Sequence, residues 1–182
     1  MFEHQFLDPA AVLRFLQVTP GSVVGDFGCG GTAAFSAPLA RMVGADGLVV
    51  MFDVRKSVVG AALSAMRLQG LTNTRGIWTD LEVFHGAREI ADASLDAGIM
   101  VNLLHESQHH LELLTEVGRM LKPHGELLVV EWEKVTDHPL APPIQQRLTK
   151  GYAADVAKQA GLAVAESFSP DQDHWGLRLV KN

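Results

Sequence analysis

Cysteine is nearly absent from this sequence: Cys29 is the one example among 182 residues. A chain with a single thiol cannot form a disulfide within itself, and it lacks the several cysteines that a thiolate metal centre needs. Disulfides mark oxidising compartments, so their absence agrees with a reducing one. We therefore expect neither a disulfide framework nor a bound metal.

Long apolar runs and an excess of positive charge are also missing. No stretch reaches the roughly 18 apolar residues of a membrane span, and Met1 to Asp8 contains neither the basic cluster nor the apolar run of a secretory signal. The 15 Lys and Arg residues are outnumbered by 21 Asp and Glu, a formal net charge of -6, which repels a phosphate backbone. These absences predict a cytoplasmic protein that binds neither membranes nor bulk nucleic acid.

The chain has no low-complexity tract, and its composition, 47% hydrophobic and 20% charged, is that of a globular protein. A length of 182 residues lies within the range of one domain. We therefore expect a single domain over residues 1–182. Its first part, residues 1–19, is expected to hold a helix that is capped by Asp8 and carries an apolar stripe as far as Leu16. The oligomeric state stays open.

Strand-like and helix-like segments then alternate along the chain. The expected strands are short apolar runs, and the expected helices carry apolar residues at helical spacing. In order they are a strand at 22–27, a helix at 33–43 that is regular from about Ser36, a strand at 47–53, a helix at 55–69, strands at 75–78 and 95–101, a helix at 110–120, a strand at 125–131, a helix between Thr149 and Gly161, and strands at 163–168 and 175–180. This order predicts an α/β fold: a Rossmann-like, mostly parallel sheet with helices on both faces and a C-terminal antiparallel hairpin.

A glycine-rich loop, Gly28-Cys29-Gly30-Gly31-Thr32-Ala33, joins the first of these strands to the following helix. Small residues there let a ligand approach the backbone, and the helix N-terminus favours a negative group. Asp53 ends the next strand 23 residues after Gly30, where a carboxylate accepts both hydroxyls of an adenosine ribose. The loop and Asp53 predict a site for an adenosine cofactor, but their spacing also fits a dinucleotide.

Two further features favour S-adenosyl-L-methionine over a nicotinamide dinucleotide. Asp26 stands two residues before the first glycine, where a carboxylate disfavours a pyrophosphate and suits a ligand with an ammonium and a sulfonium group. The chain also leaves little room for the second region with which nicotinamide enzymes usually hold their substrate. An NAD(P)-binding oxidoreductase and a non-catalytic S-adenosylmethionine-binding protein remain as alternatives.

The chain resembles the small class I S-adenosylmethionine-dependent methyltransferases of the ubiquinone/menaquinone C-methyltransferase group. The resemblance rests on four blocks, Pro20 to Gly30, Val50 to Asp53, Val101 to Glu106 and Glu116 to Glu126. It implies a seven-stranded sheet, with the methionine part of the cofactor near Asp26 to Gly30, the ribose on Asp53 and the adenine near Asp80 and Leu81. One departure is Thr32, which stands where the family usually has glycine. The full set of expected cofactor residues is Asp26, Gly28, Cys29, Gly30, Asp53, Val54, Asp80, Leu81 and Asn102.

Two of the cofactor carboxylates also have simpler interpretations. Asp53 could cap the helix that begins near Arg55, and Asp80 could be a turn or capping residue. Cys29 lies at a helix N-terminus, which can lower the pKa of a thiol, but we interpret it as a small loop residue.

The expected reaction is methyl transfer to a small-molecule acceptor, with O-, C- and N-methylation all open. Where the acceptor must lose a proton, a base belongs at the carboxyl end of the fourth strand. His105 and Glu106 lie there and are the candidate catalytic residues, with local packing and capping as the alternative. Glu131 and Trp132 end the fifth strand beside the same crevice, whereas Trp175 is expected in the core.

Two segments outside the sheet pattern are candidates for a lid over the crevice. They are His4 to Leu7 and the proline-rich stretch Leu140 to Ile144. Substrates of such folds enter at the carboxyl ends of the parallel strands, which is where a lid would act.

Overall fold

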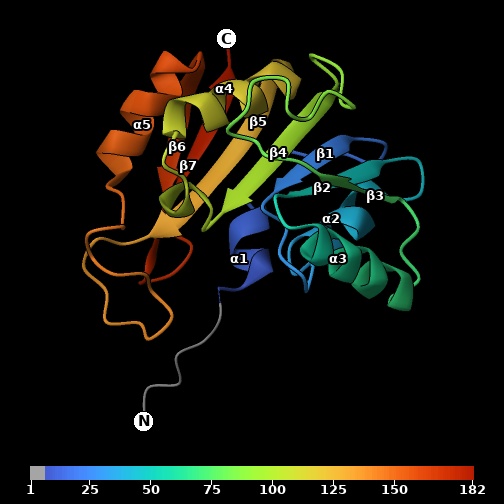
Figure 1. The fold of residues 1–182 in the computed structure, drawn as a ribbon, viewed down its shortest axis with the longest axis horizontal. Helices are drawn as coiled ribbons and strands as arrows, with labels where there is room; N and C mark the ends of the chain where they lie inside the picture. The colour runs from blue at the N-terminus through green and yellow to red at the C-terminus, as the bar shows by residue number, and fades with distance from the viewer. Residues whose placement is uncertain (1–6) are drawn as a thin grey trace.

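Seven strands form one sheet in the order β3-β2-β1-β4-β5-β7-β6 (Figure 1). This is seen in a computed structural model that describes residues 7–182. The elements are α1 (Pro9–Leu13), β1 (Val23–Phe27), α2 (Ser36–Val43), β2 (Leu48–Asp53), α3 (Lys56–Leu68), β3 (Thr74–Trp78), β4 (Leu95–Val101), the 3-10 helix η1 (Leu104–Glu106), α4 (His110–Met120), β5 (Leu121–Trp132), α5 (Lys150–Gln159), β6 (Leu162–Phe168) and β7 (His174–Lys181).

The sheet has the expected mixture of directions. Strands β1 to β5 pair in parallel, whereas β7 runs antiparallel to both β5 and β6. The predicted α/β class and the C-terminal antiparallel hairpin are therefore confirmed. Because β7 runs against β5, its first residue, His174, lies opposite Trp132, the last residue of β5.

Each face of the sheet is covered by its own helices. Alternate strand residues such as Phe27 and Phe52 belong to a buried cluster with α4 and α5. Their neighbours, such as Val49 and Met51, pack with α1, α2 and α3 on the other face. Strands that are buried on both faces read as nearly continuous apolar runs, which is why β1, β2 and β4 are visible in the sequence.

Most element boundaries lie within one residue of the expectations, and α1 and β5 differ by more. Helix α1 ends at Leu13 rather than near Leu16, because Phe15 and Leu16 donate to the carbonyl oxygens of Val12 and Leu13 in tight turns. Strand β5 begins at Leu121 rather than 125, and its register with β4 shifts after the Leu95–Leu121 pair. Among the described residues, no helix is long and apolar enough to span a membrane.

The order of the strands creates the crevice in which a ligand can bind. From β1 the chain moves to β2 and β3 on one side, and then crosses to β4 and β5 on the other. The connections on the two sides of β1 lie on opposite faces of the sheet, and such a reversal leaves a crevice at the carboxyl ends of the strands. The arrowheads in Figure 1 show that the carboxyl ends of β4 and β5 lie at one edge.

A buried ion pair anchors the segment between β3 and β4 to helix α4. Glu116 is fully buried and accepts hydrogen bonds from the backbone N–H groups of His85 (2.9 Å) and Ala87 (3.1 Å). The Arg119 guanidinium donates to the same carboxylate at 2.9 and 2.7 Å, and to the carbonyl oxygen of Ile90 at 2.9 Å. These contacts hold down a segment with little regular structure, whose first residues reach the crevice.

We expect Glu116→Ala to lower the free energy of unfolding by roughly 3 to 5 kcal/mol, because Arg119 loses its buried partner and keeps only the exposed Asp92, and two backbone N–H groups lose their acceptor. Urea denaturation measures this loss. The matched control is Glu89→Ala, which removes the exposed Arg75–Glu89 pair and should cost less than about 1 kcal/mol. Equal losses in the two variants would contradict an anchoring role for Glu116.

Candidate active site

A cavity of about 390 Å³ opens at the carboxyl ends of β1 to β4. Its volume lies within the range of small-molecule and cofactor sites. The cavity is lined by Gly28, Gly30, Asp53, Val54, Arg55, Thr79, Asp80, Leu81, Glu82, Asn102, Leu103, Glu106, Ser107 and Leu113. The structure thus brings seven of the nine expected cofactor residues to one cavity.

Backbone conformation explains the glycines of the loop. Gly28 and Gly30 have φ angles of 78° and 63°, in the left-handed region that glycine adopts without strain. A Cβ on Gly28 would lie 2.9 Å from Leu103 Cδ1, so the loop after β4 packs directly on the glycine loop. A Cβ on Gly30 would have no described atom within 4 Å. Gly30 therefore leaves open space on the cavity side of the loop.

Asp53 combines a structural bond with a free acceptor. Its Oδ1 accepts the backbone N–H of Arg55 at 2.9 Å, which shapes the turn before α3. Arg55 itself is the N-cap of α3, so Asp53 is not the cap. Oδ1 also lies 3.4 Å from Arg55 Nε, whereas Oδ2 has no hydrogen-bond partner within residues 7–182. The carboxylate is thus held in place with one oxygen available to a ligand.

The far end of the cavity is formed by residues after β2 and β3. Asp80 Oδ1 accepts the backbone N–H of Glu82 at 2.9 Å, so the carboxylate shapes a turn and also lines the cavity. Leu81 is buried, whereas Val54 is 60% exposed and offers an apolar wall. The apolar wall of Val54 and the carboxylate of Asp80 together suit a flat ring that carries an amino group.

Two expected cofactor residues, Asp26 and Cys29, are buried and do not line the cavity. Burial raises the pKa of Asp26 to about 6, although the hydrogen bond from the Ser36 hydroxyl opposes the rise. Burial, followed by the negative charges of Asp26 and Asp53, raises the pKa of the Cys29 thiol to about 12. The thiol is therefore protonated at neutral pH and cannot act as a nucleophile.

His105 is paired with Glu131 beside the cavity. His105 Nδ1 lies 2.7 Å from Glu131 Oε2, and the backbone N–H of His105 donates to Oε1 at 3.2 Å. The side chains are 9% and 1% exposed. Burial by itself would lower the pKa of His105, but the hydrogen bond and the charges of Glu131 and Glu106 raise it above its ordinary value. Glu106, the next residue, lines the cavity, whereas His105 does not.

Sequence reasoning did not identify one residue near the cavity, His174. It is 2% exposed, stacks on Trp132 at a centroid distance of 4.1 Å, and lies 3.3 Å through Nε2 from Asn102 Nδ2. No motif marks it, because it reaches the site only through the antiparallel register of β5 and β7. Trp175, in contrast, is fully buried in the core, as predicted.

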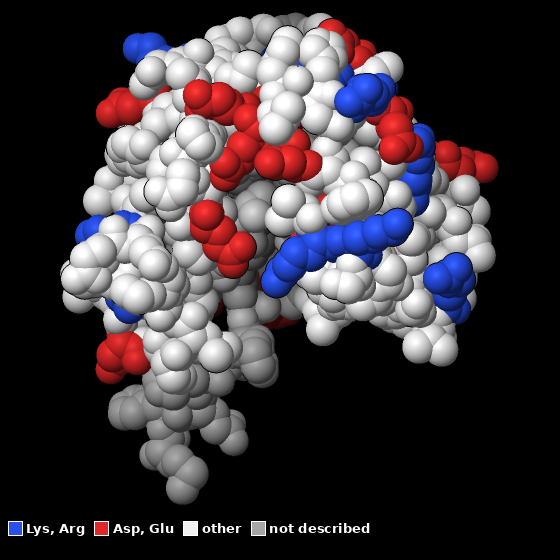
Figure 2. All heavy atoms as spheres, in the orientation of Figure 1, with Lys and Arg blue, Asp and Glu red and all other residues white. Residues whose placement is uncertain are grey.

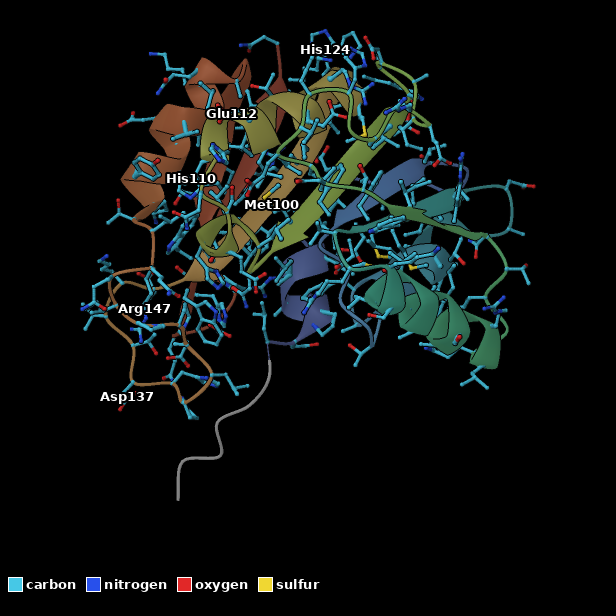
Figure 3. The ribbon with its side chains drawn as sticks, in the orientation of Figure 1. Met100, His110, Glu112, His124, Asp137 and Arg147 are labelled. Atoms are coloured by element: carbon cyan, nitrogen blue, oxygen red, sulfur yellow. The ribbon has the colours of Figure 1, made fainter. Side chains whose placement is uncertain are left out.

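The second lid candidate lies in an irregular segment between β5 and α5, on which Figure 3 labels Asp137 and Arg147. Arg147 donates to the carbonyl oxygens of Pro142 (2.6 Å) and Thr136 (2.7 Å), and Lys134 donates to those of Ile144 and Arg147. Residues 140–144 do not line the cavity in this conformation. Residues 4–6 of the first candidate lie outside the described residues. The lid stays a prediction.

The surface charge around the site has one dominant sign. On the face shown in Figure 2, Asp and Glu side chains gather around a hollow near the centre, and a Lys or Arg side chain crosses beside it. Asp53, Asp80, Glu82 and Glu106 supply four carboxylates to the cavity, against the single guanidinium of Arg55. Such a lining favours a cationic ligand over a pyrophosphate.

The fold and this cavity together define the class I methyltransferase architecture. A S-adenosylmethionine-dependent methyltransferase from Aquifex aeolicus superimposes with a TM-score of 0.87 at 24% identity, covering 97% of this chain and 90% of that one. The [4+2]-cyclase SpnF superimposes with a TM-score of 0.80 at 17% identity, covering 95% and 79%. These likenesses show the fold, and the second shows that this fold also serves other chemistry.

Sequence comparison places the chain within one family. The profile of the family described as Methyltransferase domain matches residues 25–129, so the chain belongs to that family. The ubiquinone/menaquinone biosynthesis C-methyltransferase UbiE of Hydrogenovibrio crunogenus is 30% identical over 164 residues, which are 86% of this chain and 63% of that protein. The chain therefore spans less than two thirds of the length of this relative.

The methyl donor of the family, S-adenosylmethionine, fits the residues present. The free oxygen of Asp53 and the open space at Gly30 lie on the same cavity. The buried Oδ1 of Asn102, another lining residue, has no hydrogen-bond partner within the described part of the chain. Acceptors without partners are what a ligand with several donor groups requires.

We expect Asp53→Ala to weaken binding of S-adenosylhomocysteine by roughly 1 to 3 kcal/mol, because Asp53 is the expected charged acceptor for the ribose hydroxyls. Isothermal titration calorimetry measures the change. The control is Asp46→Ala, which removes an exposed carboxylate outside the cavity and should leave the affinity unchanged. Unaltered binding by the Asp53 variant would contradict the assignment of the ribose to this residue.

Proposed function

We propose that this chain methylates a carbon atom of a small organic molecule, using S-adenosylmethionine as the donor and His105 as the base. The observation that carries the proposal is the His105–Glu131 pair, which adjoins the cavity-lining residue Glu106. The name of the Hydrogenovibrio relative, a C-methyltransferase, supports carbon as the acceptor.

The cofactor supplies an activated methyl group, whose bond to sulfur breaks as the new carbon–carbon bond forms, with the electron pair of the broken bond left on sulfur. An acceptor carbon that carries hydrogen must also lose a proton. We assign that proton to Nε2 of His105. A positioned base of this kind typically contributes about 10² to 10⁴ in rate.

Glu131 prepares His105 for this role. Its carboxylate accepts hydrogen bonds only, so the contact at 2.7 Å requires the proton of the neutral ring to sit on Nδ1. The lone pair is then on Nε2. The second contact, from the backbone N–H of His105 to Oε1, fixes the carboxylate relative to η1. Glu131 also stabilises the imidazolium that forms when the proton arrives.

The remaining cavity residues bind and align the donor. Asp53 accepts from the ribose, and Asp80 with Leu81 and Val54 receives the adenine. The open space at Gly30 admits the methionine part. In-line displacement depends strongly on alignment, so the acceptor belongs between this donor site and His105.

Incubating the protein with methyl-labelled S-adenosylmethionine and an extract of small metabolites identifies the methyl acceptor. We expect label in a carbon–methyl product and release of S-adenosylhomocysteine. Label on oxygen or nitrogen would overturn the assignment to carbon. Tight cofactor binding without any labelled product would favour a binding protein without catalysis.

With that acceptor, the pH dependence of kcat/KM tests the base. Only neutral His105 accepts a proton, so kcat/KM should rise with pH and level off above the pKa of His105, which lies above its ordinary 6.5. In Glu131→Gln the negative charge is lost, and the inflection should move to lower pH. A wild-type rate that is independent of pH from 5 to 9 would contradict a titrating base.

We expect His105→Gln to lower kcat by about 100-fold or more while the affinity for S-adenosylhomocysteine stays the same. The control is His109→Gln, an exposed histidine outside the cavity, for which kcat should match the wild type. Single-turnover measurements separate the chemical step from binding. Retention of full kcat in the His105 variant would remove this residue from the mechanism.

A further inference from the structure

The side chain of Asn102 occupies an unusual position at the cavity. Asn102 follows β4 and has a φ of 52°, in the left-handed region that asparagine adopts more readily than other residues with a Cβ. Its backbone N–H donates to the carbonyl oxygen of Val130 at 2.8 Å, which fixes this residue to β5.

A chain of hydrogen bonds determines which way the Asn102 amide points. The Asp171 carboxylate lies 2.9 and 3.1 Å from His174 Nδ1 and can only accept, so Nδ1 carries the proton. The NH₂ group of Asn102 faces Nε2 at 3.3 Å, and because an amide NH₂ group only donates, Nε2 is the acceptor in this contact. The carbonyl oxygen of the amide, Oδ1, is thereby turned away from His174.

This orientation leaves Oδ1 buried without a hydrogen-bond partner among residues 7–182. A buried acceptor without a partner costs free energy, unless a bound ligand supplies the donor. Asn102 lines the cavity, and Leu103 after it packs on Gly28, at the end of the cavity where the methionine part belongs. The ribose hydroxyls and the adenine amino group are assigned to Asp53 and Asp80. The donor that remains is the ammonium group of the cofactor.

We propose that Asp171 and His174 are positioning residues, which orient the Asn102 amide so that its Oδ1 accepts a hydrogen bond from the ammonium group of S-adenosylmethionine. This inference rests on the cofactor assignment made above. Neither residue lines the cavity: His174 is buried against Trp132, and Asp171 lies in the link between β6 and β7. The hairpin that completes the sheet thereby also serves the donor site.

Two ligands separate this role from a general structural one. S-adenosylhomocysteine carries the ammonium group, whereas 5′-methylthioadenosine has the same adenosine but no amino-acid part. In His174→Phe, which keeps an aromatic ring beside Trp132, affinity for S-adenosylhomocysteine should fall about tenfold. Affinity for methylthioadenosine should stay within about twofold. Equal losses for both ligands, or no loss for either, would overturn the proposal.

Two substitutions of Asp171 test whether a hydrogen-bond acceptor at this position is sufficient for cofactor binding. Asp171→Asn keeps an oxygen that accepts from His174 Nδ1 and should bind S-adenosylhomocysteine nearly as well as the wild type. Asp171→Ala should show the loss seen with His174→Phe. The matched control, His110→Phe, alters a histidine at the start of α4 that contacts Tyr152 (Figure 3) and should bind both ligands normally.

A measurement on the unmodified protein covers the case in which His174→Phe does not fold. Nitrogen-15 NMR of the imidazole groups at pH 7.5 should show His174 with its proton on Nδ1, before any ligand is added. A proton on Nε2 would overturn the proposal, since the amide of Asn102 would then point the other way. Failure of the wild type to bind S-adenosylhomocysteine would instead defeat the cofactor assignment itself.

Discussion

The site depends on one geometric constraint, the convergence of parallel strands at a single edge of the sheet. Strands β1 to β4 all run the same way, so their carboxyl ends deliver the glycine loop, Asp53, Asp80 and Asn102 to one cavity. The reversal of strand order at β1 opens the space between them. Gly28 and Asn102, which are 74 positions apart in the chain, thereby line the same cavity.

Buried carboxylates hold this arrangement together, each with its own partner. Glu116 binds Arg119 and fixes the segment after β3, Glu131 binds His105 at the end of β5, and Asp26 accepts from Ser36 beneath the glycine loop. A buried charge is tolerated only when it is paired or hydrogen-bonded. The pairs therefore restrict which loop conformations are compatible with the folded sheet.

The sequence was informative where a residue and its role lie close together along the chain. The strands, the glycine loop and Asp53 follow from apolar runs and short spacings, and the start of α5 follows from Thr149, whose side chain caps Tyr152 N–H. Contacts between distant segments gave no local signal. His174 lies 72 positions after Asn102 in the chain, and the two side chains meet only because β7 pairs antiparallel with β5 in this register.

The central claim is that the cavity binds a cationic sulfonium cofactor and not a dinucleotide. Calorimetric titration of the wild-type protein with S-adenosylmethionine, S-adenosylhomocysteine and NAD tests this claim most directly. The carboxylates of the cavity and its opening at Gly30 predict saturable binding of the two sulfur compounds at one site, and no measurable heat from NAD. Tight binding of NAD, with no response to either sulfur compound, would contradict the account.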